Sequence, residues 1–158
     1  MSFFRASGNV VAAAGTAPFL TINGAAGRNI KVKQIIISGA SLTAVAYLRL
    51  AVAKFSTAHS GGTSTAPTSI ALDSSDPTLP GAVLAAYTVA PTPGTLVGNI
   101  SERRILGQAT TAAAAGSPVQ VVFDLNVPLY STSENISLLL PTAPASAVTV
   151  SFEVLFES

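Results

Sequence analysis

"AVTVSFEVLFE" (residues 147–157) is the stretch that decides the fold class. Large apolar side chains alternate in it with mostly polar ones. One face is predicted to carry Val148, Val150, Phe152, Val154 and Phe156, and the other Thr149, Ser151, Glu153 and Glu157. A period of two residues is typical of a β-strand with one buried face. The stretch therefore predicts a half-buried strand.

Two earlier stretches alternate in the same way. "RNIKVKQIIIS" (28–38) places Ile30, Val32 and Ile36 opposite Lys31, Lys33 and Ile35; "SLTAVAYLRLAVAKF" (41–55) places Leu48, Leu50 and Val52 opposite Tyr47, Arg49 and Phe55. Weaker candidates lie at 19–22, 68–72, 83–89, 96–106, 119–125 and 136–140. Clusters of Gly, Pro, Asn and Ser separate them, and no stretch predicts a convincing helix.

This spacing predicts an all-β fold, an antiparallel jelly-roll β-sandwich of about eight or nine strands. The 158 residues suit one domain. Residues 1–18 show no alternation, so we expect an N-terminal arm there, with Phe3 and Phe4 as anchors. Residues 19–158 are then the sandwich domain.

The surface is predicted to be poor in charge. Only 9% of residues are charged, where a soluble domain has about 25%. We expect much of this surface to be covered by subunits or a larger assembly; the alternative is a secreted β domain rich in Ser and Thr. The net charge of +1 is too balanced to steer the protein towards nucleic acid or an anionic membrane.

The chain's single histidine, His59, lies in "KFSTAHSGGTSTAPTSIALDSSDP" (54–77). The stretch holds the residue types of a Ser-His-Asp triad: Ser56, His59, Ser60, Asp73 and Asp76. All of them sit in one Ser/Thr-rich connection, and a flexible loop is a poor support for catalytic geometry. We therefore expect a loop that touches a partner, with positive φ at Gly61 and Gly62 and Asx-turns at the two aspartates. No catalytic residue, cofactor or metal is expected.

"SERRILG" (101–107) holds the chain's adjacent arginine pair. Arg103 and Arg104 are predicted to point to opposite faces of a strand, one of them pairing with Glu102 or a neighbouring subunit. Two arginines without interleaved aromatics are weak evidence for nucleic-acid binding. Lys31 and Lys33 share a strand face and predict an exposed sheet edge, where lysine discourages aggregation.

Several segments resemble a known group of proteins: "KFSTAHSGGTSTAPT" (54–68), "LDSSDP" (72–77), "AAYTVAPTPGTLVG" (85–98) and the terminal strand. They are similar to small tailed-bacteriophage virion proteins of the capsid decoration or cement type. The resemblance covers residues 29–158 and is most specific over 54–98. It implies a jelly-roll fold, binding to the outside of a capsid built from a different coat protein, and no catalytic residues.

The function expected is therefore structural: a non-enzymatic cement protein on the outer surface of a phage head, bridging seams between major capsid protein subunits. The expected partners are that capsid protein and other copies of this chain, as a dimer or trimer, with no nucleic acid, membrane or small-molecule substrate. The expected partner contacts are Phe3, Phe4, Arg5, Lys54, His59 and Arg103.

Two other functions stay open. The first is a tail, fibre or receptor-binding module of the virion, since jelly rolls often bind sugars. The second is a non-viral extracellular β module.

Overall fold

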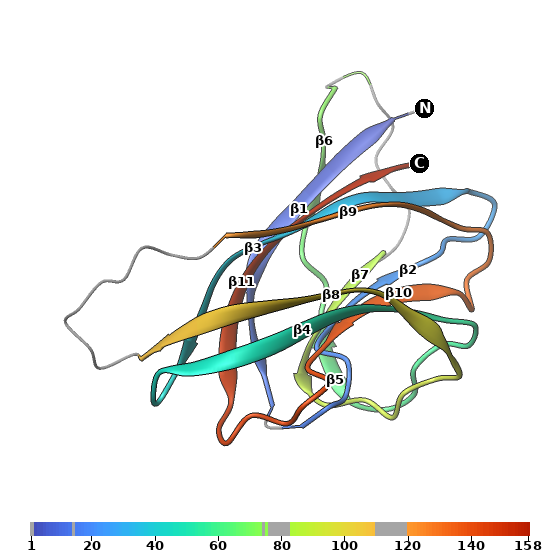
Figure 1. The fold of residues 1–158 in the computed structure, drawn as a ribbon. Helices are drawn as coiled ribbons and strands as arrows, with labels where there is room; N and C mark the ends of the chain where they lie inside the picture. The colour runs from blue at the N-terminus through green and yellow to red at the C-terminus, as the bar shows by residue number, and fades with distance from the viewer. Residues whose placement is uncertain (1, 14, 74, 76–82, 110–119) are drawn as a thin grey trace.

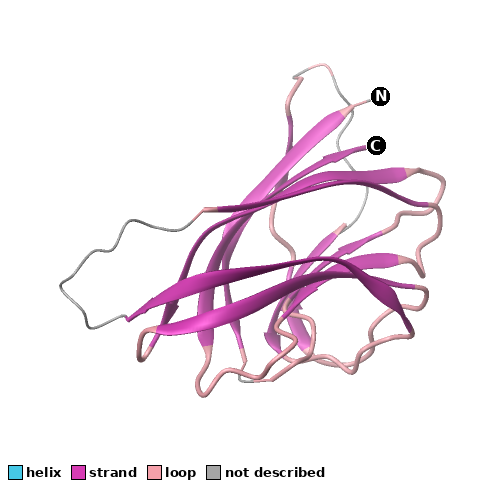
Figure 2. Ribbon diagram, in the orientation of Figure 1, coloured by secondary structure: helices cyan, strands magenta, loops and turns pink. Residues whose placement is uncertain are grey.

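The computed structural model describes residues 2–13, 15–73, 75, 83–109 and 120–158. Among them the regular structure is entirely β (Figure 2), and no helix that could span a membrane is found. The strands are β1 (Phe3–Ala12), β2 (Leu20–Asn23), β3 (Ile30–Leu42), β4 (Ala46–Phe55), β5 (Thr63–Thr65), β6 (Ser69–Ala71), β7 (Leu84–Val89), β8 (Leu96–Ala109), β9 (Val121–Leu129), β10 (Asn135–Leu139) and β11 (Val148–Glu157).

The strands form one connected, curled sheet (Figure 1). Their order is β5-β7-β2-β10-β4-β8-β3-β11-β1-β6. β9 is outside this order and pairs with β3 along the edge opposite β11. Neighbours are antiparallel except β3 and β8, which share a short parallel pairing of 41–42 with 108–109. This pairing joins two halves: β6-β1-β11-β3-β9 and β5-β7-β2-β10-β4-β8.

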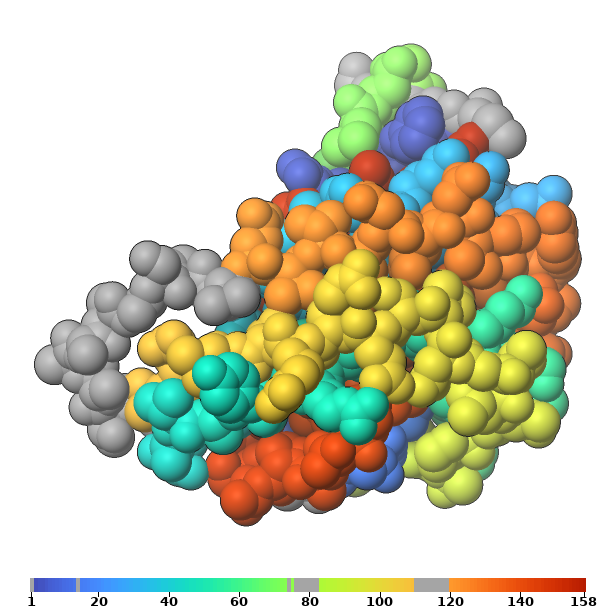
Figure 3. All heavy atoms as spheres, viewed as in Figure 1, coloured from blue at the N-terminus to red at the C-terminus, as the bar shows by residue number. Residues whose placement is uncertain are grey.

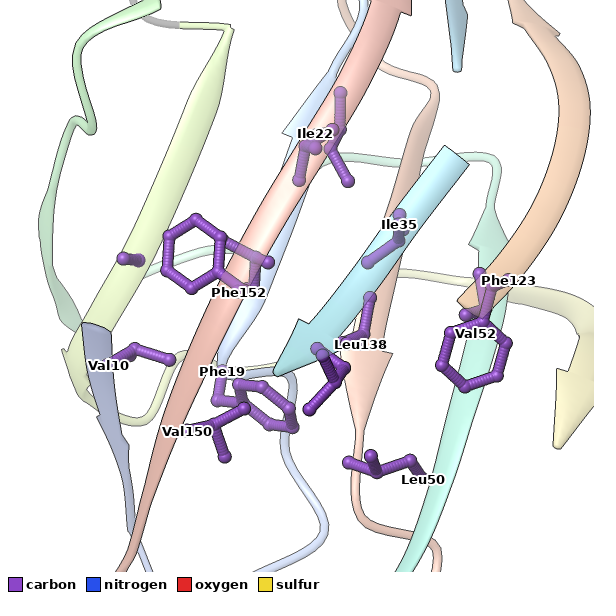
Figure 4. Close-up of a cluster of buried hydrophobic side chains, with 14 of the residues drawn as sticks. Val10, Phe19, Ile22, Ile35, Leu50, Val52, Phe123, Leu138, Val150 and Phe152 are labelled. Atoms are coloured by element: carbon purple, nitrogen blue, oxygen red, sulfur yellow. The ribbon is translucent and has the colours of Figure 1, made fainter. Parts of the chain in front are cut away.

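The core lies between these halves because each strand turns its apolar face inward. Figure 4 shows Val10, Ile35, Phe123 and Phe152 from the first half near Ile22, Leu50, Val52 and Leu138 from the second. All eight side chains are buried. Burying one such side chain fully stabilises a fold by about 1.5–3 kcal/mol, so the packing of the two halves is the main source of stability.

β11 confirms the prediction from its alternation. Its five apolar residues on one face are buried in the core, as expected. β11 is also hydrogen-bonded along both edges, to β1 and to β3. It is therefore a central strand of its half of the sheet.

The predicted N-terminal arm is wrong over most of its length, because residues 3–12 form β1. This strand pairs along its whole length with β11 and briefly with β6. Its inward positions are Phe4, Ala6, Gly8, Val10 and Ala12. Because most of these residues are small, the hydrophobic alternation of the strand is weak in the sequence. A Cβ on Gly8 would lie 3.2 Å from the ring of Phe152. The small residues make room for a large ring on the neighbouring strand.

The predicted alternation in β3 is wrong after Val32. The register shifts between Val32 and Gln34, which marks a β-bulge. The bulge turns Ile35 into the core and leaves Ile36 half-buried, the reverse of the prediction. The edge interpretation of Lys31 and Lys33 is also wrong, because β3 lies between β11 and β9. The two lysines are accommodated on the outer face instead.

The loop predicted at 54–77 is interrupted by regular structure. It contains the end of β4 and the short strands β5 and β6. Gly61 and Gly62 do adopt positive φ, of 65° and 74°, and a Cβ on Gly62 would lie 2.7 Å from the carbonyl oxygen of Val89. Asp76 lies outside the described residues.

Candidate functional site

The predicted contacts in β1 separate into buried and exposed residues. Phe4 is 1% exposed, and its ring stacks on Phe156 with centroids 5.6 Å apart. The prediction that Phe4 contacts a partner is therefore wrong, because its position in the strand points it into the core. Phe3 is 42% exposed, and the exposed Arg5 forms an ion pair with Glu153. These two stay on the outer face.

Lys54 lies at the end of β4 and forms an ion pair within the chain. Its Nζ is 3.2 Å from Oε1 of Glu134. The backbone N–H of Tyr130 donates to the other oxygen of Glu134 at 2.7 Å. That hydrogen bond and Lys54 hold the pKa of Glu134 below its usual value. Lys54 thus connects β4 to the loop before β10, whatever else it contacts.

His59 is half-buried beside β10. Its Nδ1 accepts a hydrogen bond from the Gly94 N–H at 2.9 Å, and its Nε2 lies 2.8 Å from Oγ of Ser137. Because Nδ1 is an acceptor, the neutral ring carries its proton on Nε2 and donates it to Ser137. Burial lowers the pKa of His59, which favours this neutral form. The ring also meets Phe55 edge-on, with centroids 4.7 Å apart.

Ser137 connects His59 to a wider network of hydrogen bonds. Its Oγ donates to Oδ1 of Asn135 at 3.0 Å and lies 2.8 Å from Oγ1 of Thr21. Asn135 Nδ2 in turn donates to the Thr57 carbonyl at 3.1 Å. A Cβ on Gly94 would lie 2.2 Å from that carbonyl oxygen, so the position requires glycine. The network fixes the loops at 56–60 and 90–95 against β2 and β10.

The Ser137–His59 pair does not have the geometry of a catalytic nucleophile and base. A triad needs the histidine Nδ1–H to donate to a carboxylate, whereas here Nδ1 accepts from a backbone N–H. Ser137 is 0% exposed and directs its proton to Asn135. The arrangement therefore fits a structural network, one that sequence reasoning missed because its members are far apart along the chain.

Two other triad candidates, Ser56 and Asp73, make hydrogen bonds that do not involve His59. Ser56 Oγ donates to the Thr95 carbonyl at 3.4 Å. Asp73 Oδ1 accepts from the N–H and Oγ of Ser75 at 2.9 and 2.7 Å, which lowers the pKa of Asp73 and confirms its predicted Asx-turn. Within the described residues, no group of three His, Asp or Glu side chains is placed to hold a metal ion.

Arg103 lies on β8, where the two arginines follow the predicted alternation. Arg103 is opposite Leu50, and Arg104 is opposite Arg49 on the outer face. The Glu102 carboxylate pairs with Arg49, while Arg103 donates to the Glu102 carbonyl at 3.0 Å. Arg104 lies over the ring of Tyr47, 5.2 Å from its centroid. Arg103 is thus exposed and held to its own strand by one bond.

β8 also carries an exposed apolar segment that sequence reasoning missed. The exposed fractions are 54% for Leu96, 63% for Val97 and 40% for Ile100. β8 pairs with β4 along one edge, and along the other its described pairing is confined to 108–109. Figure 3 shows β8, in yellow, crossing the front of the molecule between β4 and β9. The sequence does contain a signal for this segment. In "LVGNI" (96–100) the apolar residues occupy both faces of the strand, so they cannot all be buried in one core.

The predicted contact residues are not brought together. Phe3 and Arg5 lie on one half of the sheet, and Lys54 and Arg103 on the other. The chain matches no protein-family model, no curated protein and no solved structure. The apolar segment 96–100 on the edge of β8 is therefore the candidate contact surface.

Proposed function

We propose that this protein is a cement or decoration protein of a bacteriophage particle. In this role it binds the outside of the head across seams between major capsid protein subunits and stabilises the shell. The observation that carries the proposal is the exposed apolar segment of β8, in a chain with only 9% charged residues. The resemblance of residues 54–98 to virion proteins supports the same function.

The pairing of the strands supports a jelly-roll fold for this protein. With the short strands β5 and β6 and the neighbouring β7 set aside, β1 pairs with β11, β2 with β10, β3 with β9 and β4 with β8. Such nested pairs result when one long antiparallel hairpin is rolled up, which is the principle of the jelly roll. The strands β5, β6 and β7 then lie in the connection between the fourth and fifth strands of the roll.

The edge of β8 suits a contact that is hydrophobic and made through the backbone. An exposed edge strand presents N–H and C=O groups that can pair with a strand of another chain. Burying Leu96, Val97 and Ile100 would add about 25 cal/mol for each Å² of apolar surface removed from water. Many copies on one shell make modest individual contacts sufficient.

The experiment that tests the proposal is the copy number of the protein in purified phage particles, measured by quantitative mass spectrometry. A simple ratio to the major capsid protein is expected of a shell component. A few copies per particle would favour the tail or fibre alternative. Absence from particles would refute both virion functions.

A paired substitution tests the contact surface. We expect Val97→Asp to abolish binding of the full chain to heads that lack it, because an aspartate cannot be buried there without a partner. Val11→Asp is the matched control, since Val11 on β1 is similarly exposed, at 50%. It should bind like the unaltered protein. Equal binding by both variants would exclude β8 as the contact.

A further inference from the structure

A pocket of about 770 Å³ lies on the other half of the sheet from β8. It is formed where β1, β3, β9 and β11 come together near the labelled ends of the ribbon (Figure 1). Its volume falls within the range of about 300–1,000 Å³ typical of small-molecule sites. The residues that matter for its chemistry are Arg28, Lys31, Asn126, Pro128, Tyr130 and Glu157.

Two cationic side chains of the pocket make no ion pair among the described residues. Arg28 and Lys31 line it, and within the described part of the chain neither side chain forms an ion pair or a hydrogen bond. The acidic side chain in the lining, Glu157, is only 5% exposed, and Lys33 Nζ lies 2.9 Å from its Oε2. Because Lys33 already neutralises Glu157, the two other cations are available to an anionic ligand.

One buried polar atom of the lining has no partner. Among the described residues, Ser158 Oγ makes no hydrogen bond. Lys33 Nζ donates to Asn126 Oδ1 at 3.1 Å and lies 2.9 Å from Glu157 Oε2, so the carboxylate is ion-paired. Buried polar atoms in proteins are nearly always paired. Hydroxyl groups of a ligand, or water ordered by it, would complete the pairing here.

The pocket also offers a flat apolar surface. Tyr130 is 67% exposed beside Pro128. An exposed tyrosine gives a ligand ring both an apolar face and a polar tip. Asn126 lies next to them, with φ of 57°, at the bulge where β9 pairs with Val32 and Gln34.

We propose that this pocket binds an acidic saccharide, a sugar carrying a carboxylate. The sugar ring lies against Tyr130 and Pro128, and its carboxylate lies between Arg28 and Lys31, where a guanidinium can form paired hydrogen bonds. Its hydroxyls face Asn126 and Glu157. The Glu157 carboxylate in the lining can accept hydrogen bonds from sugar hydroxyls, whereas it would repel a polyphosphate. The site shares no residue with the β8 segment, so it does not rest on the proposed capsid role.

Titration of the full chain with glucuronic acid tests the proposal, followed by chemical shifts in NMR. Glucose is the neutral counterpart, and inorganic phosphate is the anion without a sugar ring. For an open pocket we expect a Kd on the order of 1 mM for glucuronic acid. Glucose and phosphate should each bind about tenfold more weakly, because each lacks one half of the contacts. Equal binding of glucose, equal binding of phosphate, or no saturable binding of glucuronic acid would each overturn the proposal.

Variants then localise the site. Tyr130→Ala and Arg28→Gln should each raise the Kd for glucuronic acid by about tenfold. Tyr47→Ala is the matched control, because Tyr47 is 71% exposed beside Arg104 but lies outside the pocket. It should leave the Kd unchanged. Circular dichroism spectra that match the unaltered protein establish that each variant is folded. Unchanged affinity in Tyr130→Ala, or equal losses in Tyr130→Ala and Tyr47→Ala, would overturn the assignment.

Discussion

β11 and β8 are both long strands rich in aliphatic residues, yet those residues have opposite surroundings. β11 is paired along both edges, and its Val150 and Val154 are fully buried. β8 is paired with β4 along one edge, and its Leu96, Val97 and Ile100 are exposed. The comparison teaches that an aliphatic side chain stabilises the fold or remains available to a partner according to where its strand lies in the sheet.

The largest effect is expected where β1 packs on β11. Phe4→Ala should lower the free energy of unfolding by about 3–5 kcal/mol, because it removes a buried ring that stacks on Phe156. Phe3→Ala should cost far less, because Phe3 points to the exposed face of the same strand. Urea unfolding followed by circular dichroism measures both. Similar losses for the two variants would contradict the assignment of β1 as a core strand.

A smaller loss is expected in the second half of the sheet. Ser137→Ala should lower the free energy of unfolding by about 1–3 kcal/mol, because it leaves His59 and Asn135 without a buried partner. Ser56→Ala is the control: its hydroxyl is exposed, and a change within about 0.5 kcal/mol is expected. Urea unfolding of both proteins is the measurement. If Ser137→Ala were as stable as the unaltered protein, the network would not support the fold.

The same network predicts a dependence on pH. Burial lowers the pKa of His59 below its unfolded value of 6.5, so the folded state binds the proton less readily than the unfolded chain. Stability from this residue is complete above pH 6.5 and is lost as pH falls towards the lower folded pKa. Unfolding free energies measured across this window should decline on acidification, and His59→Gln should flatten the decline. An equal slope in the variant would exclude His59 as the cause.

The smallest effect on stability is expected at β8, and it sharpens the comparison most directly. Val97→Thr should change the free energy of unfolding by no more than about 0.5 kcal/mol but weaken binding of the full chain to heads that lack it. Val150→Thr, the same change on β11, should be strongly destabilising because it buries a hydroxyl. A large loss of stability in Val97→Thr would show that the edge of β8 is covered within the monomer.

The candidate contact surface on β8 could not be predicted from the sequence. The covered surface expected from the charge-poor composition stays a prediction, as do the contacts expected at Phe3 and Arg103, which are both exposed. Phe4 could not be excluded from the sequence, because a phenylalanine next to another reads equally well as core or as anchor. The exposed apolar segment of β8 and the pocket beside Arg28 depend on which strands lie at edges and which chain segments meet. That information is not local.

The amino-acid sequence by itself determined the β class of this protein, the core face of β11 and the glycine turn at 61–62. These features follow from the two-residue period of a strand and from the backbone freedom of glycine, which act over a few neighbouring residues. Only the tertiary structure decided that residues 3–12 are a core strand, that a bulge exchanges Ile35 and Ile36, and that His59 supports a network with Ser137. Each of these depends on contacts between residues far apart in the chain, whose energies no short stretch of sequence contains.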